Sequence, residues 1–289
     1  MQKIGFIGLG IMGAPMAGHI LKGGYPLTVY NRTHAKTADL ATQGANVAMT
    51  PKAVAENSDL IVVIVSRSAD VEAVLFGEEG LSKADLKGKI IVDMSTIEPS
   101  EAIRFAKEMA KMGAQMIDAP VSGGDVGAKN ATLTIMAGGD KTTFNRCLPI
   151  FELMGKKINY MGVSGTGQAT KMCNQIMVTA SLMGVCEGLA MAKVQGLDLE
   201  KVREVVLGGV GASAQLEVVA PKIIAGDDSP GFFVELMAKD LGIVKAAQAE
   251  KGLPSQVVEL GLAQMKQLMS QGHGKLGTQS IARNFGPRG

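Results

Sequence analysis

The sequence has no tryptophan, only three cysteines and three histidines, and an aromatic content of 4%. The cysteines (Cys147, Cys173 and Cys186) match neither a disulfide framework nor a zinc spacing. We therefore expect buried thiols, a reducing cytoplasm and no metal site. The histidines lie in no motif, which argues against hydrolysis by a serine–histidine pair.

The sequence also lacks an excess of either charge sign, because it has 29 Lys and Arg against 27 Asp and Glu and a net charge of only +2. This balance gives no electrostatic reason to expect binding to nucleic acid or to an anionic membrane. The most apolar stretch, residues 172–186, is too short to span a bilayer and contains four polar residues: Asn174, Gln175, Thr179 and Ser181. A buried helix is expected there. The N-terminal letters MQKIGFIGLG predict a folded strand and turn rather than a signal peptide.

The 289 residues suffice for two domains, and the first half of the chain predicts an α/β domain. Apolar, β-branched runs occur at KIGFIG, LTVYN, LIVVIV, IIVDMS and AQMIDAP, and ATLTIMAGG adds a strand near residue 135. Helical patterns such as residues 99–113 separate these runs. Alternating strands and helices indicate βαβ units, so we expect a Rossmann-type domain with a mostly parallel sheet over residues 1–163.

The second half loses the strand pattern, and we expect an all-α C-terminal domain over residues 164–289. Turn residues separate five apolar-periodic segments: 168–195, 198–208, 213–225, 235–251 and 255–271. The long first segment is expected to link the two domains. The glycine-rich tail, residues 272–289, is expected to be only partly ordered.

The letters GFIGLGIMGAPMA contain the spacing Gly8-x-Gly10-x-x-Gly13 directly after an apolar strand and at the start of a helix. In that context the glycines are typical of a dinucleotide site. Gly8 allows the tight turn, Gly10 lets the backbone approach a pyrophosphate, and Gly13 lets helix and strand pack closely. Ile11 and Met12, in the same turn, join the expected cofactor-binding residues.

The second strand ends in Asn31, Arg32 and Thr33, where NAD-binding proteins usually place a carboxylate against the ribose. Arg32 can pair with a 2′-phosphate, and Thr33 can donate a further hydrogen bond. The letters NRT thus favour NADPH, with NAD as a weaker cofactor. The alternative is that Arg32 is a solvated loop residue.

Lys171 is the only charged residue between positions 158 and 186. A charge in apolar surroundings is costly unless it is paired, solvated or functional. An ammonium beside a carbonyl oxygen stabilises the charge that develops during hydride transfer and then gives up a proton. Asn174 lies one helical turn later on the same face, and the letters VSGG offer a hydroxyl and open backbone amides that suit a carboxylate. The alternative is a lysine whose stem covers apolar surface while its ammonium reaches water.

Four motifs in order resemble the β-hydroxyacid dehydrogenase family, which includes 3-hydroxyisobutyrate dehydrogenase, tartronate semialdehyde reductase and the glyoxylate/succinic semialdehyde reductases. They are GFIGLGIMGAPMA, DAPVSGG at 118–124, GTGQATKMCNQ at 165–175 and AKDLGI at 238–243. The resemblance extends to about residue 270. This chain departs from the commonest family pattern at Asn174-Gln175, where many members have Asn-Asn, and at Asn130-Ala131, where Asp-Gly is common.

The resemblance implies roles for individual residues. Lys171 matches the catalytic lysine, and Asn174 matches an asparagine that holds the substrate. Ser122, Gly123 and Gly124 match the carboxylate-binding loop.

Two further matches, Thr96 and Lys239, imply contacts near the nicotinamide, although Lys239 next to Asp240 also fits an ordinary surface pair. The expected function is NADPH-preferring interconversion of a short carboxylate-bearing aldehyde and its hydroxy acid, by a cytoplasmic homodimer or homotetramer. The open substrates are tartronate semialdehyde, succinic semialdehyde, glyoxylate, 3-hydroxyisobutyrate and 3-hydroxypropionate. The alternatives are an imine reductase on the same fold and a non-catalytic nucleotide-binding module.

Overall fold

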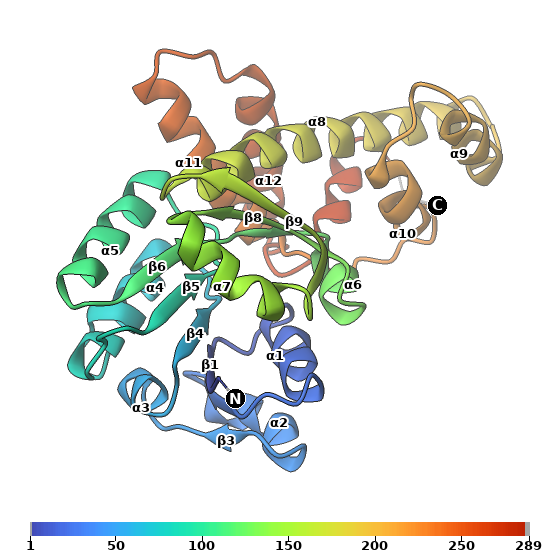
Figure 1. Cartoon of the computed structure of the whole chain (residues 1–289). Coiled ribbons are helices and arrows are strands. Elements are labelled where there is room, and N and C mark those ends of the chain that lie inside the picture. Colours follow the sequence, from blue (N-terminus) through green and yellow to red (C-terminus); the bar gives the residue numbers. More distant parts are fainter. Residues whose placement is uncertain (1, 287–289) are drawn as a thin grey trace. The chain divides into compact units, whose positions relative to one another are not determined.

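A computed structural model describes residues 2–286, and the chain divides into two compact units between Lys171 and Met172. The first unit contains one sheet in the order β3-β2-β1-β4-β5-β6-β8-β7, with β9 beside β8 (Figure 1). The strands are β1 Ile4–Ile7, β2 Leu27–Tyr30, β3 Asn46–Val47, β4 Leu60–Val63, β5 Ile90–Asp93, β6 Gln115–Asp118, β7 Val121–Ser122, β8 Leu133–Gly138 and β9 Gly155–Gly162. The six-strand run from β3 to β6 is parallel, whereas β8 pairs antiparallel with β6 and β7. The expected mostly parallel sheet is confirmed.

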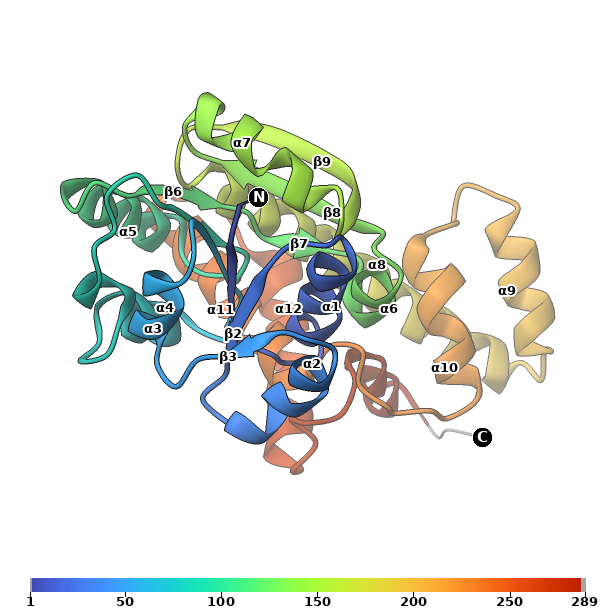
Figure 2. The same cartoon turned by 60° about the horizontal axis from the view of Figure 1, so that its bottom comes forward.

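Helices cover both faces of this sheet because its strands are apolar on both sides. Along β1, Phe6 packs in the cluster formed with α1 and α7, and the next residue, Ile7, packs in the cluster formed with α3, α4 and α5 (Figures 1 and 2). Alternation of side chains along a strand produces these two cores, as in parallel sheets buried on both faces. The helices are α1 Gly13–Lys22, α2 Ala38–Thr42, α3 Pro51–Glu56, α4 Ser68–Phe76, α5 Pro99–Lys111, α6 Gly124–Lys129 and α7 Lys141–Phe151.

The second unit is helical, as the sequence predicts. Helix α8, Thr166–Val194, begins in the first unit and continues into the second. The remaining elements are α9 Leu199–Leu207, a π-helical turn Gln215–Val219, α10 Ala220–Ile224, α11 Val234–Glu250, α12 Gln256–Ser270 and a 3₁₀ segment Thr278–Asn284. Residues of α8, α11 and α12, among them Leu182, Leu241 and Met265, form its main apolar core.

Helix α8 has a buried stripe that contains four polar residues: Gln168, Lys171, Gln175 and Thr179. The buried positions recur every three or four residues: Gln168, Lys171, Gln175, Thr179, Leu182 and Cys186. By length and composition alone α8 is apolar enough to cross a membrane, a test that core helices also meet. The prediction of three buried thiols is wrong for Cys173, which lies on the opposite, exposed stripe. Cys147 is buried in the first unit, and this burial raises the pKa of its thiol to about 12.

The glycine-rich tail is more ordered than expected as far as residue 286, while residues 287–289 lie outside the described part of the chain. Ile281 is fully buried, and Gln279 Nε2 donates to the carbonyl oxygens of Asp227 and Ser229, both at 2.9 Å. The hydroxyl of Ser280 donates to Asp228. These long-range bonds fix a segment whose local composition alone indicates mobility.

Candidate active site

The glycine turn after β1 has the geometry that a dinucleotide phosphate requires. Gly8 has φ of +101°, and a Cβ there would lie 2.0 Å from the Ile64 carbonyl oxygen. A Cβ at Gly13 would lie 1.9 Å from the carbonyl oxygen of Gly8, whereas one at Gly10 would meet nothing within 4 Å. Gly8 and Gly13 are thus required for packing, and Gly10 leaves the backbone open. The turn lies where the strand order reverses between β1 and β4, which is where such sheets bind ligands.

The residues after β2 combine a structural amide with an exposed cation. Asn31 Oδ1 accepts from the backbone N–H of Leu9 (2.8 Å), and its Nδ2 donates to the carbonyl oxygen of Thr33 (2.9 Å). Asn31 therefore fastens the glycine turn to the end of β2. The Arg32 side chain is 89% exposed and lies 3.4 Å from an oxygen of Asp70, a carboxylate partner on α4 that the sequence did not reveal.

The other expected cofactor residues lie on the same unit. Ile11 is partly exposed in the glycine turn, and Met12 packs against the core cluster beneath α1. Thr96 lies in the segment after β5, between Ser95 and Ile97. The Ser95 hydroxyl accepts from the backbone N–H of Val65, which follows β4, so the ends of neighbouring strands are tied together.

Two groups, one at the end of β6 and one at the start of β7, bond to the first turns of α8. Asp118 is 3% exposed; its Oδ1 accepts from the N–H of Gly165 (2.7 Å) and its Oδ2 from the N–H of Gln168 (3.0 Å). Burial raises the pKa of Asp118 to about 6, although these backbone bonds favour the carboxylate. On α8, three residues after Gln168, the Lys171 ammonium donates to the carbonyl oxygen of Val121 at 2.8 Å.

Lys171 is 8% exposed, and this burial argues against a lysine whose ammonium simply extends into water. The residue that accepts its hydrogen bond, Val121, directly precedes the expected carboxylate loop. Ser122 ends β7, and Gly123 and Gly124 have φ of +130° and +61°. A Cβ at Gly124 would meet nothing within 4 Å, so the backbone there is open to a ligand.

Four polar side chains in the second unit are connected by two hydrogen bonds and one ion pair, and we call them the amide–carboxylate chain. Asn174 Nδ2 donates to Gln175 Oε1 (2.8 Å), and Gln175 Nε2 donates to Asp240 Oδ2 (2.6 Å). Lys239 Nζ lies 2.8 Å from the other oxygen of Asp240. The Asp240 and Lys239 side chains are 2% and 13% exposed, so this is not an ordinary surface pair.

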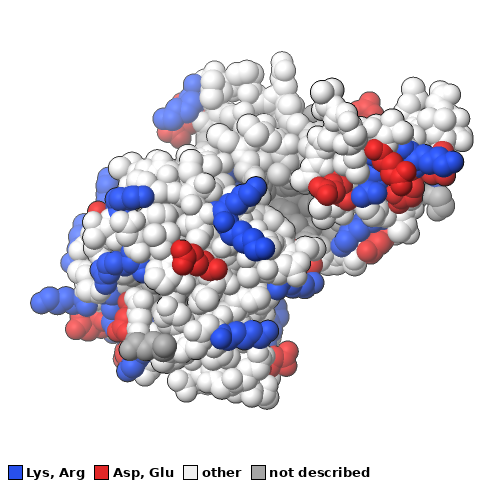
Figure 3. All heavy atoms as spheres, turned by 45° about the vertical axis from the view of Figure 1, so that its right-hand side comes forward, with Lys and Arg blue, Asp and Glu red and all other residues white. Residues whose placement is uncertain are grey.

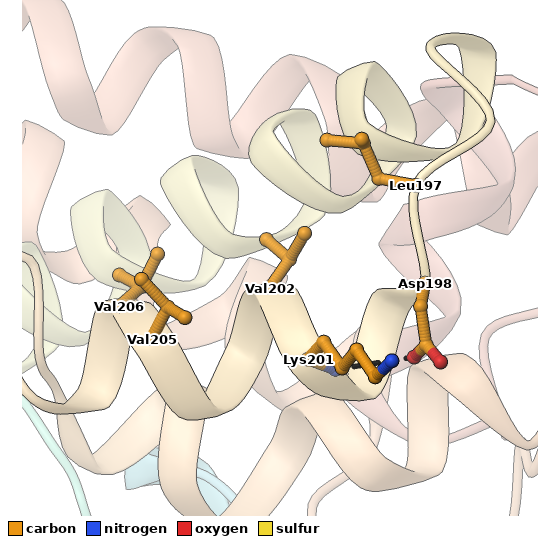
Figure 4. Close-up of a pocket in the computed structure, with 6 residues that line it drawn as sticks. All are labelled: Leu197, Asp198, Lys201, Val202, Val205 and Val206. Atoms are coloured by element: carbon orange, nitrogen blue, oxygen red, sulfur yellow. Dashed lines mark hydrogen bonds between the residues drawn. The ribbon is translucent and has the colours of Figure 1, made fainter.

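Other surface features do not include the expected site residues. The groove in Figure 4 is lined by Leu197, Asp198, Lys201, Val202, Val205 and Val206, at α9 and the turn before it. On the face shown in Figure 3, Lys and Arg are interspersed with Asp and Glu rather than gathered into one basic field. The described residues contain no cluster of three or more His, Cys, Asp or Glu that could hold a metal.

Two family descriptions match the chain. The NAD binding domain of 6-phosphogluconate dehydrogenase matches residues 3–181, and the NAD-binding domain of NADP-dependent 3-hydroxyisobutyrate dehydrogenase matches residues 165–285. The chain belongs to the β-hydroxyacid dehydrogenase family. As a member of this family it is an oxidoreductase with an NAD(P)-binding Rossmann domain, and the glycine turn described above fits that cofactor.

Its relatives include a named reductase, a plant dehydrogenase-like protein and a solved structure. It is 46% identical to 2-hydroxy-3-oxopropionate reductase of Escherichia coli K12, over 87% of this chain and 85% of the relative. It is 44% identical to a probable mitochondrial 3-hydroxyisobutyrate dehydrogenase-like protein of Arabidopsis thaliana, over 96% of this chain and 84% of the relative. The crystal structure of 3-hydroxyisobutyrate dehydrogenase from Salmonella typhimurium has a TM-score of 0.90 at 26% identity and covers 99% of this chain and 100% of its own.

Two more solved structures bear on the cofactor and on the rival function. Psf3 in complex with NADP⁺ and 2-OPP has a TM-score of 0.90 at 26% identity, over 98% of this chain and 100% of its own. An imine reductase from Pseudomonas sp. has a TM-score of 0.66 at 20% identity, over 99% of each chain, which is a likeness of fold alone.

Four buried polar residues of the site were not assigned roles from the sequence: Asp118, Gln168, Gln175 and Asp240. Each lies within or beside a motif already recognised. Gln168, Lys171 and Gln175 also share the helical spacing of one face, so their common stripe in an apolar stretch was a usable signal. Apart from the bond between the neighbours Asn174 and Gln175, their hydrogen-bonding partners lie 47 to 73 residues away in the sequence, and no local pattern identifies those.

Proposed function

We propose that this protein is an NADPH-preferring reductase that interconverts a short carboxylate-bearing aldehyde and its hydroxy acid. The observation that carries the proposal is the buried Lys171 ammonium, bonded to the Val121 carbonyl directly before the Ser122–Gly124 loop. A proton-donating group and an open anion-binding backbone thus lie beside each other, in a chain that also has a dinucleotide turn.

The roles follow from the chemistry of the side chains. A bound reduced nicotinamide supplies the hydride. Lys171 stabilises the negative charge that develops on the carbonyl oxygen and donates the proton; in the oxidation direction, unprotonated Lys171 accepts it. The Ser122 hydroxyl and the backbone of Gly123 and Gly124 bind the carboxylate, and Asn174 binds a second substrate oxygen.

Cofactor preference rests on the residues after β2. No carboxylate occupies the position of Asn31, and Arg32 is exposed enough to pair with a 2′-phosphate. Thr33 adds a hydroxyl beside it. Ile11, Met12, Thr96 and Lys239 complete the proposed cofactor contacts.

The same proposal includes a cytoplasmic homodimer or homotetramer. Apolar side chains exposed in the second unit support self-association, among them Met191, Val194 and Val205. The bacterial reductase relative and three free cysteines are compatible with the cytoplasm.

Of the two rival functions, imine reduction on this fold is disfavoured because such enzymes typically lack a lysine at this position. A non-catalytic nucleotide-binding module is disfavoured by the presence of Lys171, Asn174 and Ser122 together.

The test is an activity panel with NADPH and with NADH. We expect turnover with at least one of 2-hydroxy-3-oxopropionate, succinic semialdehyde and glyoxylate, with 3-hydroxyisobutyrate and 3-hydroxypropionate assayed in the oxidative direction. A cyclic imine serves as the rival substrate. The 46% identical reductase makes 2-hydroxy-3-oxopropionate the first compound to assay. Turnover of the imine alone, or of no compound while NADPH binds, would overturn the proposal.

A further inference from the structure

The side chain of Gln168 connects helix α8 to the segment after β5. Gln168 is fully buried; its Oε1 accepts from the backbone N–H of Ile97 (3.1 Å) and its Nε2 donates to the carbonyl oxygen of Ser95 (2.8 Å). These two partners are the residues on either side of Thr96. The Gln168 amide therefore bonds to the residues on both sides of Thr96, which we expect to contact the nicotinamide.

The same residue is fixed from its own backbone. The N–H of Gln168 donates to Asp118, and the preceding Gly167 lies so close to other strands that a Cβ there would be 2.4 Å from the Met136 carbonyl oxygen. The first turn of α8 therefore has little freedom to shift. Lys171 follows one turn later on the same buried stripe, so displacement of this turn would move the ammonium.

We propose that Gln168 is a positioning residue that holds the Thr96 segment in register with Lys171. The inference rests on the proposed function, because it assigns Gln168 to the geometry of that site. Its side chain offers one donor and one acceptor at matching reach, which a methionine of similar length lacks. Loss of this alignment is expected to slow the chemical step more than cofactor binding, because a misplacement near 1 Å costs on the order of 100-fold in rate.

Two variants test the amide directly. Gln168→Met removes both hydrogen bonds, and we expect kcat to fall about 10- to 100-fold while NADPH affinity changes less than about threefold. Gln168→Glu keeps the acceptor, but it donates to the Ser95 oxygen only when protonated. Burial favours the protonated acid, as do the carboxylates of Asp118, which accepts from the N–H of residue 168, and of Asp93, which accepts from the N–H of Ser95, while the Lys171 ammonium one turn away acts in the opposite direction. The ratio of Gln168→Glu to wild-type kcat should therefore rise as pH falls, whereas the ratio for Gln168→Met should stay flat.

Gln279→Met is the matched control, because Gln279 is also buried and its Nε2 also donates to two main-chain oxygens. This variant should lose stability and keep kcat. Three outcomes would overturn the inference: kcat of Gln168→Met within twofold of wild type, an equal loss of kcat in Gln279→Met, or a pH-independent ratio for Gln168→Glu.

A measurement without turnover separates this inference from the proposed function. Hydrogen exchange at the Ile97 amide should become at least about tenfold faster in Gln168→Met, because its acceptor is removed, and should not change in Gln279→Met. Unchanged exchange at Ile97 would overturn the inference even in an active enzyme. An inactive wild-type protein with faster exchange in the variant would overturn the proposed function instead.

Discussion

The buried polar groups of the proposed site are held in different ways in the two units. In the first unit, Lys171 and Gln168 bond to main-chain oxygen and N–H groups, and Asp118 accepts from main-chain N–H groups. In the second unit, the amide–carboxylate chain consists of side chains bonded to one another. A main-chain partner survives any substitution that preserves the fold, whereas a side-chain partner can be exchanged.

This difference separates interactions that substitutions leave unchanged from interactions that substitutions can replace. The proposed proton donor belongs to the part with main-chain partners. The Asn174 amide, proposed to bind substrate, is oriented through Gln175, at a position where many family members have asparagine. The comparison predicts that changes in the first unit abolish chemistry, while changes in the amide–carboxylate chain alter substrate affinity.

The largest effect is expected for Lys171→Ala, which should lower turnover by roughly 100- to 10,000-fold, the range for loss of a general acid or base. The main-chain carbonyl of Val121, which accepts from Lys171, cannot supply the proton that the lysine would donate. Steady-state assays should show the loss, while NADPH titration and circular dichroism show a folded, cofactor-binding protein. Lys171→Arg should not restore turnover, since guanidinium keeps its proton at these pH values. Near-normal turnover in the alanine variant would refute the mechanism.

Arg32 is an exception within the first unit, because its partner is the side chain of Asp70 and it is highly exposed. Arg32→Ala should raise the KM for NADPH by about 10- to 100-fold, as expected for a lost charge-assisted phosphate contact, and leave the KM for NADH nearly unchanged. Asp70→Asn is the matched control and should maintain or lower the KM for NADPH. Equal effects of Arg32→Ala on both cofactors would contradict the preference for NADPH.

Gln175→Leu tests the side-chain network and should have a smaller effect. It removes the Gln175 acceptor of Asn174 and the donor to Asp240 Oδ2, so we expect KM for the aldehyde to rise by about tenfold with kcat reduced less. The exposed Gln267 on α12 provides a control, and Gln267→Leu should leave both parameters unchanged. A fall in kcat as large as that of Lys171→Ala would remove the distinction between the two units.

The last comparison concerns stability and pH rather than turnover. The pKa of Asp118 is raised from its ordinary value of 3.8 to about 6 by burial, so the folded protein binds this proton more tightly than the unfolded chain. Its contribution to the free energy of unfolding is therefore largest below about pH 4 and declines as pH rises to about 6, by on the order of 3 kcal/mol. Urea unfolding should therefore show that the free energy of unfolding of the wild type, relative to that of Asp118→Asn, falls as pH rises across this range.

Asp140→Asn is expected to show the opposite pH dependence in the same unfolding experiment. The pKa of Asp140 is lowered because the carboxylate accepts from the N–H and hydroxyl of Thr143 at the start of α7. Its contribution is present above the unfolded pKa and is lost as pH falls. If both aspartates gave the same sign, burial of Asp118 would not be the dominant cause of its shift.

Most elements of this fold followed from local patterns, while the positions of several site groups did not. Strand periodicity predicted six strands of the described sheet, and the spacing of Gly8, Gly10 and Gly13 predicted the turn after the first of them, because both reflect backbone requirements within a few residues. The two-residue strands β3 and β7 and the strand β9 were not predicted. Lys171 could also be identified locally, because no other charged residue lies near it in the sequence. Its hydrogen bond to Val121 and the bridge from Gln168 to Ser95 join residues 50 and 73 positions apart, and only the folded sheet brings those segments together.

The exposed stripe of α8 has a practical consequence. Cys173 lies on it two residues after Lys171, while Cys147 and Cys186 are buried. A thiol-directed fluorophore or spin label should therefore attach at one place on the native protein without prior removal of the other cysteines. Because the labelled stripe faces away from the buried polar residues, the probe can report rearrangement of this helix as cofactor and aldehyde are added, in real time and without a chromogenic substrate.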